Sequence, residues 1–328
     1  MKAMLWTKYG SADVLQLKIV DTPAPKDNEV LIKILATTVL VGDCELRGLK
    51  FSQFLSIPLR LLLGFTRPKR VTILGQELAG KIEAIGAGIT KFKPGDQVVA
   101  ATLLRLGTYA EYTCLPESYP ALKPENMTYE EAATIPTGGI YGLHLVRNAD
   151  LHPGQRLLIN GAGGSIGTYA VQIAKYLGSE VTAVDSEGKL GMLRSIGADY
   201  VIDYMREDFT KSDETYDAII DVIGKSSFSG SLRRLAKYGR YVLGNPNFSA
   251  RIRAGLFQRA ADQKIILGEP TNRAEAYSFL KSLIEAGRIK PIIDRGYTFE
   301  QLPEAHRYVE AGHKKGSVVI TIGHAEQT

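Results

Sequence analysis

Residues 157–189 read LLINGAGGSIGTYAVQIAKYLGSEVTAVDSEGK, and this stretch decides the fold. An apolar run leads into a glycine turn, Ala162-x-Gly164-x-x-Gly167, and apolar residues at helical spacing follow it. A second apolar run ends at Asp185, 21 residues after Gly164. Small residues at such a turn let the backbone approach a pyrophosphate, and the helix N-terminus offers N–H groups to that charge. The stretch therefore predicts a dinucleotide-binding site, with an ordinary turn between strand and helix as the alternative.

The second half of the chain alternates helical and strand patterns. After the glycine turn, the apolar face of the expected helix carries Ile166, Ala170, Ile173 and Leu177. Gly178 is well placed to end that helix. The strand candidates are 157–160, 181–185, 200–203, 218–222, 241–243 and 265–267. Helical stretches lie between these strands, so we expect an α/β domain with a right-handed, mostly parallel sheet.

The first 120 residues are instead typical of a compact β-rich domain. Strand candidates there are 29–36, 78–85, 97–101 and 108–115, and Lys93-Pro94-Gly95-Asp96 is a turn signal. The tail predicts helices near 273–286 and 299–310 and a closing strand at 318–322. We expect this tail to return to the first domain. The predicted divisions are 1–122 for the β-rich catalytic domain, 123–267 for the dinucleotide-binding domain and 268–328 for the return.

The composition favours a cytoplasmic enzyme. The chain is 45% hydrophobic and 23% charged, and it has no run of 18 apolar residues and no signal-peptide pattern in MKAMLWTKYG. Cys44 and Cys114 are its two cysteines, which excludes a disulfide framework and a four-cysteine zinc lobe. The net charge of +5 is modest and comes with no nucleic-acid motif. A basic balance also suits a protein that holds a polyanionic cofactor.

Five short motifs lie in a fixed order outside the glycine turn. They are GQELAG at 75–80, FKPGDQV at 92–98, GTYAEY at 107–112, ATIP at 133–136 and KGSVV at 315–319. With the turn, they resemble the medium-chain dehydrogenase/reductase superfamily over essentially the whole chain. The resemblance implies a GroES-like β-rich catalytic domain and a Rossmann domain, which is a doubly wound parallel sheet. It also implies a homodimer.

Departures from the family's zinc enzymes indicate the branch. Leu40 stands where those enzymes carry their first cysteine ligand, Gln76 replaces the histidine of their G-H-E motif, and the third ligand position falls near Thr137. Leucine and glutamine cannot rebuild a tetrahedral zinc site. The chain therefore resembles the zinc-free quinone oxidoreductase and enoyl reductase branch. A small, apolar, conjugated acceptor can take hydride without a Lewis acid. An alcohol dehydrogenase-like activity and a catalytically silent dinucleotide-binding protein remain alternatives.

Two features of the sequence favour different cofactors, NAD(H) and NADP(H). Asp185 should bind a ribose diol and repel a 2′-phosphate, which favours NAD(H). Ser186, Lys189 and Tyr204 match positions that hold the 2′-phosphate in the zinc-free branch, which favours NADP(H) slightly. The alternatives are an N-cap role for Ser186 and an exposed helical position for Lys189. The full predicted cofactor set is Thr137, Ala162, Gly163, Gly164, Ser165, Ile166, Gly167, Asp185, Ser186, Lys189, Tyr204, Gly244 and Asn245, with Gly138 and Gly139 beside Thr137.

Asp43 and Tyr109 are the predicted catalytic residues. Residues 41–47 match the family's segment beneath the nicotinamide, where Glu45 stands at the position closest to the tyrosine of many quinone oxidoreductases. Water is therefore a candidate proton source. Asp43 could alternatively be a buried acid that orders its loop, and Tyr109 a core aromatic. Glu77 is expected to be structural, and Cys44 to be a buried, inert thiol.

Residues 47–70, RGLKFSQFLSIPLRLLLGFTRPKR, hold six basic and no acidic residues among many apolar ones. A hydrophobic flap over the substrate site is one interpretation, and a packed helix whose cations reach water is another. Contact with an anionic membrane is a third, less favoured one. The stretch 248–260, FSARIRAGLFQRA, has a similar character and could face the substrate or a partner subunit.

Overall fold

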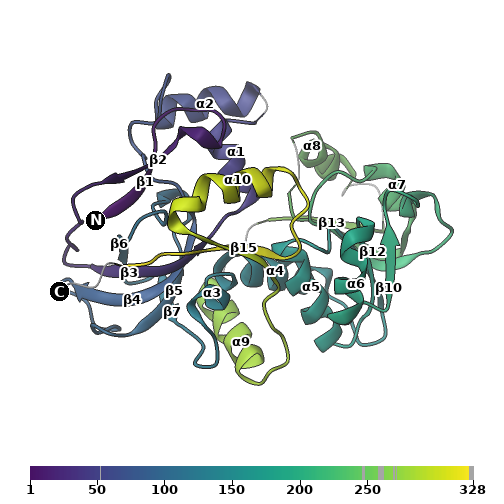
Figure 1. Cartoon of the computed structure of the whole chain (residues 1–328). Coiled ribbons are helices and arrows are strands. Elements are labelled where there is room, and N and C mark those ends of the chain that lie inside the picture. The colour runs from purple at the N-terminus through teal and green to yellow at the C-terminus, as the bar shows by residue number, and fades with distance from the viewer. Residues whose placement is uncertain (52, 246–247, 258–261, 269, 271, 325–328) are drawn as a thin grey trace. The chain divides into compact units, whose positions relative to one another are not determined.

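The structure is a computed structural model that describes all residues except 52, 246–247, 258–261, 269, 271 and 325–328. It divides into two compact units (Figure 1). Unit 1 comprises Met1–Pro136 and Ile293–Thr328, and unit 2 comprises Thr137–Ile292. Residues 123–136, predicted with the dinucleotide domain, thus belong to unit 1. Residues 268–292, predicted with the returning tail, belong to unit 2.

Unit 2 is built on a parallel sheet. Among its described residues the strand order is β10-β9-β8-β11-β12-β13. The bounds are β8 (Arg156–Asn160), β9 (Glu180–Asp185), β10 (Tyr200–Asp203), β11 (Tyr216–Asp221), β12 (Leu235–Leu243) and β13 (Lys264–Leu267). The helices are α4 (Ile140–Ala149), α5 (Ser165–Tyr176), α6 (Glu187–Ser195), α7 (Phe228–Arg233), α8 (Phe248–Phe257) and α9 (Arg273–Glu285). The order reverses between β8 and β11, so the carboxyl ends of these strands form the switch point where open α/β sheets bind ligands.

Local signals explain the first part of this sheet. Leu157, Leu158 and Ile159 are fully buried, as expected for a strand covered on both faces. Helix α5 begins after Gly164, and Gly178 follows its end with a φ of +89°, which glycine adopts without strain. The predicted apolar face is buried at Ala170 and Ile173, whereas Leu177 is 38% exposed because the helix ends before it.

Unit 1 is built on a mixed sheet of order β14-β15-β3-β4-β5-β7, with β6 paired to β3. Its strands are β3 (Glu29–Thr38), β4 (Glu77–Ile85), β5 (Gln97–Ala101), β6 (Tyr112–Pro116), β7 (Pro120–Leu122), β14 (Ile293–Thr298) and β15 (Ser317–Thr321). A separate hairpin pairs β1 (Lys2–Trp6) with β2 (Leu15–Ile19). The helices are α1 (Val41–Gly48), α2 (Gln53–Leu63), α3 (Tyr129–Ala132) and α10 (Leu302–Glu310). Residues from both chain segments share one hydrophobic core.

Predicted boundaries differ from the structure in places, and β12 begins at Leu235 rather than at Tyr241. The strand predicted at 108–115 is β6, and it begins only at Tyr112, because Tyr109 pairs through its backbone with Leu74 and Met4 instead. The apolar stretch 248–260 forms α8 as far as Phe257, and its last residues lie outside the described ones. In the part of the chain that the structure describes, no helix has the length and apolar character needed to cross a membrane.

Candidate active site

Three glycines of the turn after β8 differ in the room around them. A Cβ at Gly167 would lie 2.4 Å from the carbonyl oxygen of Gly161, so only glycine lets α5 approach the turn this closely. A Cβ at Gly163 would lie 2.5 Å from the Lys189 side chain. At Gly164, by contrast, the nearest atom would be 3.9 Å away. Gly164 therefore has room for a side chain at the N-terminus of α5, where no side chain caps the helix.

Asp185 ends β9 beside this turn, and its carboxylate is engaged within the protein. It accepts hydrogen bonds from the backbone N–H groups of Gly163 at 2.8 Å and Ser186 at 2.9 Å. Lys189, one turn into α6, forms an ion pair with it at 2.9 Å. Both side chains are largely buried, so Lys189 is not the exposed helical residue of the alternative interpretation. Ser186 occupies the N-cap position of α6, but its hydroxyl makes no capping bond.

The other predicted cofactor residues surround the same strand ends. The backbone N–H of Tyr204 donates to the Asp185 carbonyl at 3.3 Å, and the Tyr204 side chain is exposed. Thr137 and Gly138 lie in a single π-helical turn, and a Cβ at Gly138 would lie 3.1 Å from the carbonyl oxygen of Ser165. This close approach places Gly138 against the start of α5, and Thr137 precedes it in the same turn.

The ends of β11 and β12 complete this edge of the sheet. The backbone N–H of Gly244 donates to the Asp221 carbonyl at 2.9 Å. A Cβ at Gly224 would lie 2.3 Å from the carbonyl oxygen of Asn245, so these two backbones touch. Sequence reasoning had identified Gly244 and Asn245 from their place after a parallel strand, and the structure brings both to the switch-point edge.

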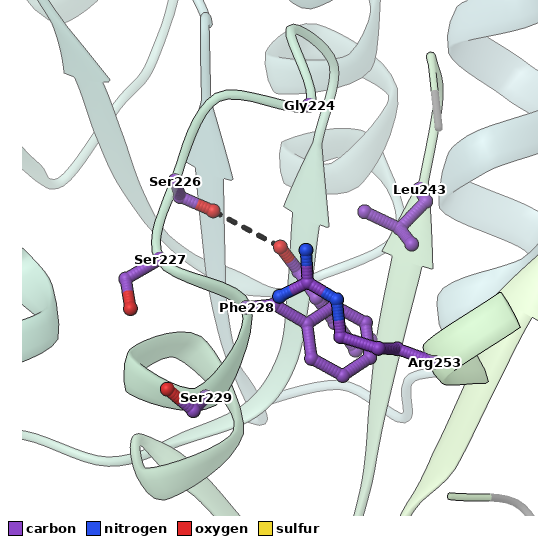
Figure 2. Close-up of a pocket in the computed structure, with 8 residues that line it drawn as sticks. Gly224, Ser226, Ser227, Phe228, Ser229, Leu243 and Arg253 are labelled. Atoms are coloured by element: carbon purple, nitrogen blue, oxygen red, sulfur yellow. Dashed lines mark hydrogen bonds between the residues drawn. The ribbon is translucent and has the colours of Figure 1, made fainter. Parts of the chain in front are cut away.

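Sequence analysis missed a small polar cavity of about 190 Å³ at this edge (Figure 2). Its lining residues are Gly224, Ser226, Ser227, Phe228, Ser229, Tyr241, Leu243 and Arg253. Arg253 lies over the Phe228 ring, 5.3 Å from its centroid. The Ser226 hydroxyl bonds both the buried Asp221 carboxylate and the Tyr241 hydroxyl. No sequence pattern signals this cavity, because its residues come from the loop after β11, from α7, from β12 and from α8.

In unit 1, Asp43 is fully buried at the start of α1. The Leu40 N–H donates to its carboxylate at 3.0 Å, the Tyr109 hydroxyl at 3.0 Å and the Gln76 side-chain amide at 2.9 Å. Burial raises the pKa of Asp43 to about 6 although these donors favour the charged form. Gln76 is only partly buried, so it links this carboxylate to the surface of unit 1.

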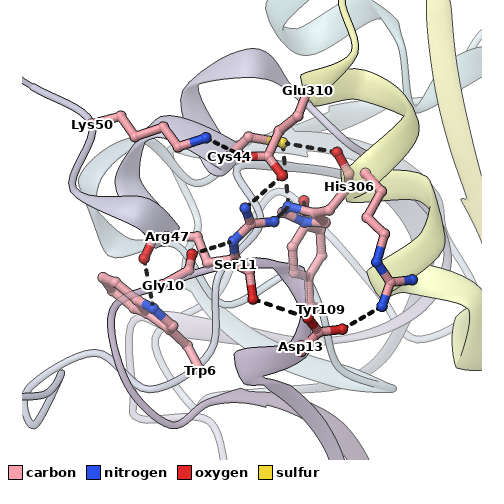
Figure 3. A network of polar contacts seen from close by, with 11 residues as sticks. Trp6, Gly10, Ser11, Asp13, Cys44, Arg47, Lys50, Tyr109, His306 and Glu310 are labelled. Atoms are coloured by element: carbon pink, nitrogen blue, oxygen red, sulfur yellow. Dashed lines mark hydrogen bonds and ion pairs between the residues drawn. The ribbon is translucent and has the colours of Figure 1, made fainter.

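A chain of polar contacts continues from Tyr109 into α10 (Figure 3). The Tyr109 hydroxyl lies 3.2 Å from Nε2 of His306, and Nδ1 of His306 lies 3.0 Å from the Arg47 guanidinium. Arg47 is fully buried and pairs with Glu310 at 2.7 Å. Sequence analysis did not identify His306, Arg47 or Glu310 as members of a site, because the contacts join positions about 260 residues apart.

The chemistry of these groups assigns the protons. Arginine only donates, so Nδ1 of His306 accepts and the ring proton lies on Nε2. His306 then donates to the Tyr109 oxygen, and Tyr109 donates to Asp43. Burial lowers the pKa of His306 to about 3 and raises that of Tyr109, so both groups are neutral near pH 7. Every donor in the chain therefore points towards the Asp43 carboxylate.

The remaining residues of interest are buried or lack metal-binding side-chain atoms. Cys44 is buried beside His306, and burial raises the pKa of its thiol to about 12. Glu77 is buried and accepts a hydrogen bond from the Thr38 hydroxyl. The Leu40 side chain has no atom that could ligate a metal, and the Gln76 amide nitrogen donates to Asp43. Within the described residues, no three His, Cys, Asp or Glu side chains gather as a metal site would require.

Comparisons with known proteins agree on one family. A model described as the alcohol dehydrogenase GroES-like domain matches residues 26–125. A model of zinc-binding dehydrogenases matches residues 196–320. The chain is 30% identical to a 2-methylene-furan-3-one reductase of Solanum lycopersicum, and 29% identical to a chloroplastic NADPH-dependent alkenal/one oxidoreductase of Arabidopsis thaliana. Each alignment covers 98% of this chain and 79% of the relative.

A solved structure shows the same likeness in three dimensions. The quinone oxidoreductase of Coxiella burnetii is 26% identical and superposes with a TM-score of 0.87. The match covers 98% of this chain and 99% of that one. The order of motifs, the two folds and these relatives lead to one conclusion: the chain belongs to the medium-chain dehydrogenase/reductase superfamily, in its quinone oxidoreductase and enoyl reductase branch.

Proposed function

We propose that this protein is a zinc-independent, NAD(P)H-dependent oxidoreductase that reduces a quinone or an α,β-unsaturated carbonyl compound. The observation that carries the proposal is the glycine turn, where Gly164 is uncrowded at a helix N-terminus that no side chain caps. A pyrophosphate fits such a place because backbone N–H groups and the helix dipole both attract its charge. The substrate class follows from the names of the relatives, which include a quinone oxidoreductase and an alkenal/one oxidoreductase.

The residues of unit 2 can hold each part of the cofactor. The backbone of Gly163, Gly164 and Ser165 would hold the pyrophosphate, and the ends of β9 and β10 the adenine ribose. The ends of β11 and β12, at Gly244 and Asn245, would border the nicotinamide half together with Thr137. A bound reduced dinucleotide supplies the hydride. The protein contributes orientation and excludes water.

We infer that NADPH is slightly preferred to NADH. The charge of Asp185 is compensated by Lys189, which weakens the repulsion of a 2′-phosphate on which the NADH interpretation depends. Lys189 carries three N–H donors and spends one on Asp185. Tyr204 is bonded through its backbone to Asp185, and its exposed hydroxyl can donate a proton to a phosphate.

Asp43 and Tyr109 remain our candidates for the catalytic unit, acting through Gln76. Both are fully buried in unit 1, so neither touches a substrate directly without a rearrangement. Asp43 fixes which end of the Gln76 amide faces it, because a carboxylate accepts only from the N–H side. The second N–H of the same amide nitrogen is then in a fixed place to donate to a developing enolate oxygen.

Zinc independence, a cytoplasmic location and a homodimer complete the proposal. Leu40 and Gln76 do not provide the thiolate and imidazole that a catalytic zinc needs. An alcohol dehydrogenase-like activity is the alternative within the family. A catalytically silent dinucleotide-binding protein is the alternative from another class.

One experiment separates these outcomes. Protein treated with a chelator is titrated with NADPH and NADH by cofactor fluorescence, and turnover is then measured with quinones, enones and alcohols. We expect NADPH to bind about tenfold more tightly, which is about 1.4 kcal/mol, and quinones or enones to be reduced. Tyr204→Phe should reduce the preference, and Tyr200→Phe, an exposed tyrosine at the start of β10, is the matched control. Binding without turnover would favour the silent protein, and zinc-dependent alcohol oxidation would favour the dehydrogenase.

A further inference from the structure

Helix α2 is apolar on two opposite sides, which is unusual for a helix at the surface. Leu59 and Leu63 pack against the core of unit 1. On the other side, Ile57 is 57% exposed and Leu61 is 69% exposed. Because Ile57 and Leu61 stay exposed, this second apolar face has no partner within unit 1. An exposed apolar face of this kind marks a surface for interaction.

The chain after α2 extends this apolar face. Leu62 is 54% exposed and Phe65 66%. The turn at Gly64 is held firmly, since the Tyr9 hydroxyl donates to its carbonyl at 2.5 Å and its N–H donates to the Arg60 carbonyl at 2.8 Å. The exposed position of Phe65 is therefore set by contacts of its neighbours.

Three cations stand beside these apolar side chains. The backbone N–H groups of Lys69 and Arg70 donate to the Leu63 carbonyl at 2.8 and 3.4 Å, which folds the segment back onto the end of α2. Arg67, Lys69 and Arg70 are exposed. Residues 51–70 contain no acidic residue, and no ion pair is recorded for these three side chains among the described residues.

We propose that this region binds the surface of an anionic lipid bilayer. We call it the α2 surface and define it by Ile57, Leu61, Leu62, Phe65, Arg67, Lys69 and Arg70. Apolar side chains of this kind enter the boundary between headgroups and acyl chains, and neighbouring cations pair with lipid phosphates. Binding of this kind is reversible and weakens with salt, because screening acts on the electrostatic part.

The charge pattern favours a bilayer over a second copy of the chain. In a two-fold dimer through this surface, both copies would contribute the same patch, so one interface would hold six cations and no acidic residue of the α2 surface. Like charges gathered at an interface destabilise it. An anionic bilayer presents the opposite charge and accepts the apolar side chains as well. The proposal is independent of the reaction that the protein catalyses.

The test is cosedimentation of the full-length protein with vesicles. Phosphatidylcholine vesicles containing about one third phosphatidylglycerol should bind the protein, and vesicles of phosphatidylcholine alone should bind it at least ~10-fold more weakly. High salt should release it. Equal binding to both vesicle types, or binding to neither, would overturn the proposal.

Two sets of variants locate the surface. Leu61→Ser with Phe65→Ser should reduce binding to anionic vesicles about 10-fold or more, and Arg67→Gln with Lys69→Gln and Arg70→Gln should do the same. Leu104→Ser is the matched apolar control, since Leu104 is 92% exposed elsewhere in unit 1. Lys81→Gln with Lys91→Gln and Lys93→Gln changes the net charge equally at exposed sites away from α2.

Two control measurements separate loss of vesicle binding from misfolding and from self-association. Circular dichroism of every variant checks that the fold is intact, and sedimentation velocity without vesicles measures self-association. Loss of vesicle binding in the α2 variants alone supports the proposal. Equal loss in the charge control would assign the binding to net charge and overturn it. Self-association that disappears in Leu61→Ser with Phe65→Ser, without vesicle binding, would overturn it in favour of a second copy.

Discussion

Glycines that look alike in the sequence have different physical roles in the turn after β8. Gly167 has no room for a side chain because backbone carbonyls lie against it. Gly164 has room within the protein, and its backbone φ of −92° is open to any residue. The first glycine to be tested for cofactor binding is therefore Gly164, since its substitution leaves the fold intact.

Gly164→Ala should weaken dinucleotide binding without destabilising the protein. The added methyl group would occupy the space next to the uncapped helix N-terminus, and we expect the Kd to rise at least ~10-fold, about 1.4 kcal/mol. Isothermal titration gives the affinity, and thermal unfolding gives the stability. Gly188→Ala, where a Cβ meets no atom within 4 Å, is the control on α6. An unchanged Kd in Gly164→Ala would refute this placement of the pyrophosphate.

The sequence predicted the residues of this turn better than their partners. The glycine spacing and Asp185 follow from local pattern alone, because turn, helix and strand are adjacent in the chain. The partners of the Asp185 carboxylate are the Lys189 ammonium and two backbone N–H groups, and these partners depend on a side-chain rotamer and on the path of the backbone. Periodicity carries no information on such contacts, so the sequence left the cofactor choice open.

At the level of elements, α1 and α10 are joined by buried polar groups. Arg47 and Asp43 lie on α1, and His306 and Glu310 on α10. Each of these buried groups has a partner. Removing one group would leave its partner buried without a hydrogen bond, which destabilises the folded protein. Amphipathic periodicity predicted a helix near 299–310, but not which buried positions on it would be polar. His306 is on its buried side, where sequence patterns favour an apolar residue.

Two titrating groups of this network, His306 and Asp43, have opposite effects on stability. The pKa of His306 falls to about 3 in the folded protein, so between pH 6.5 and 3 the unfolded chain binds the extra proton. Its contribution to the free energy of unfolding is then lost as the pH falls. The pKa of Asp43 rises to about 6 from 3.8, so between these values the folded protein binds the proton. Its contribution therefore grows as the pH falls.

We predict that removing one of these two groups leaves the pH dependence of the unfolding free energy to be set by the other. His306→Gln should flatten the fall in unfolding free energy between pH 6 and 4, and Asp43→Asn should steepen it, each by up to about 1.4 kcal/mol per pH unit. Urea denaturation at a series of pH values measures these slopes. The change in slope is the readout, because a uniform loss of stability would follow from any damage to the core. Parallel pH profiles for all three proteins would contradict the assignment.

At the level of the whole molecule, the sequence predicted both folds and the return of the tail to unit 1. The alternation of helix and strand patterns predicted the parallel sheet, because each strand and each helix has its own hydrophobic periodicity. The residue at which the chain returns to unit 1 was harder to predict from the sequence. Helix α9 has the same amphipathic pattern as any surface helix, so nothing in residues 273–285 indicates which unit it packs on. Only its contacts assign it to unit 2, where it packs on α4.

Cofactor binding should stabilise unit 2 in a measurable way. A ligand at 100 times its Kd adds about 2.7 kcal/mol to the unfolding free energy of the state that binds it. Amides of β8 and β9 that exchange by unfolding of unit 2 should then exchange about 100-fold more slowly. Hydrogen exchange with mass spectrometry measures this with and without NADPH. A protein in which β8 and β9 show no slowing would not bind the dinucleotide at the proposed turn.

The order in which the strands of unit 1 occur in the chain has a consequence for synthesis. β15 lies between β14 and β3 in the sheet, and it is made last, after all of unit 2. On the ribosome, unit 2 has every residue it needs before unit 1 does. Throughout that interval, residues 36–38 of β3 lack their partners in β15, so this part of the strand edge stays unpaired. A pause in translation near residue 292 would prolong that exposure, and nascent unit 1 is where we expect chaperones to bind.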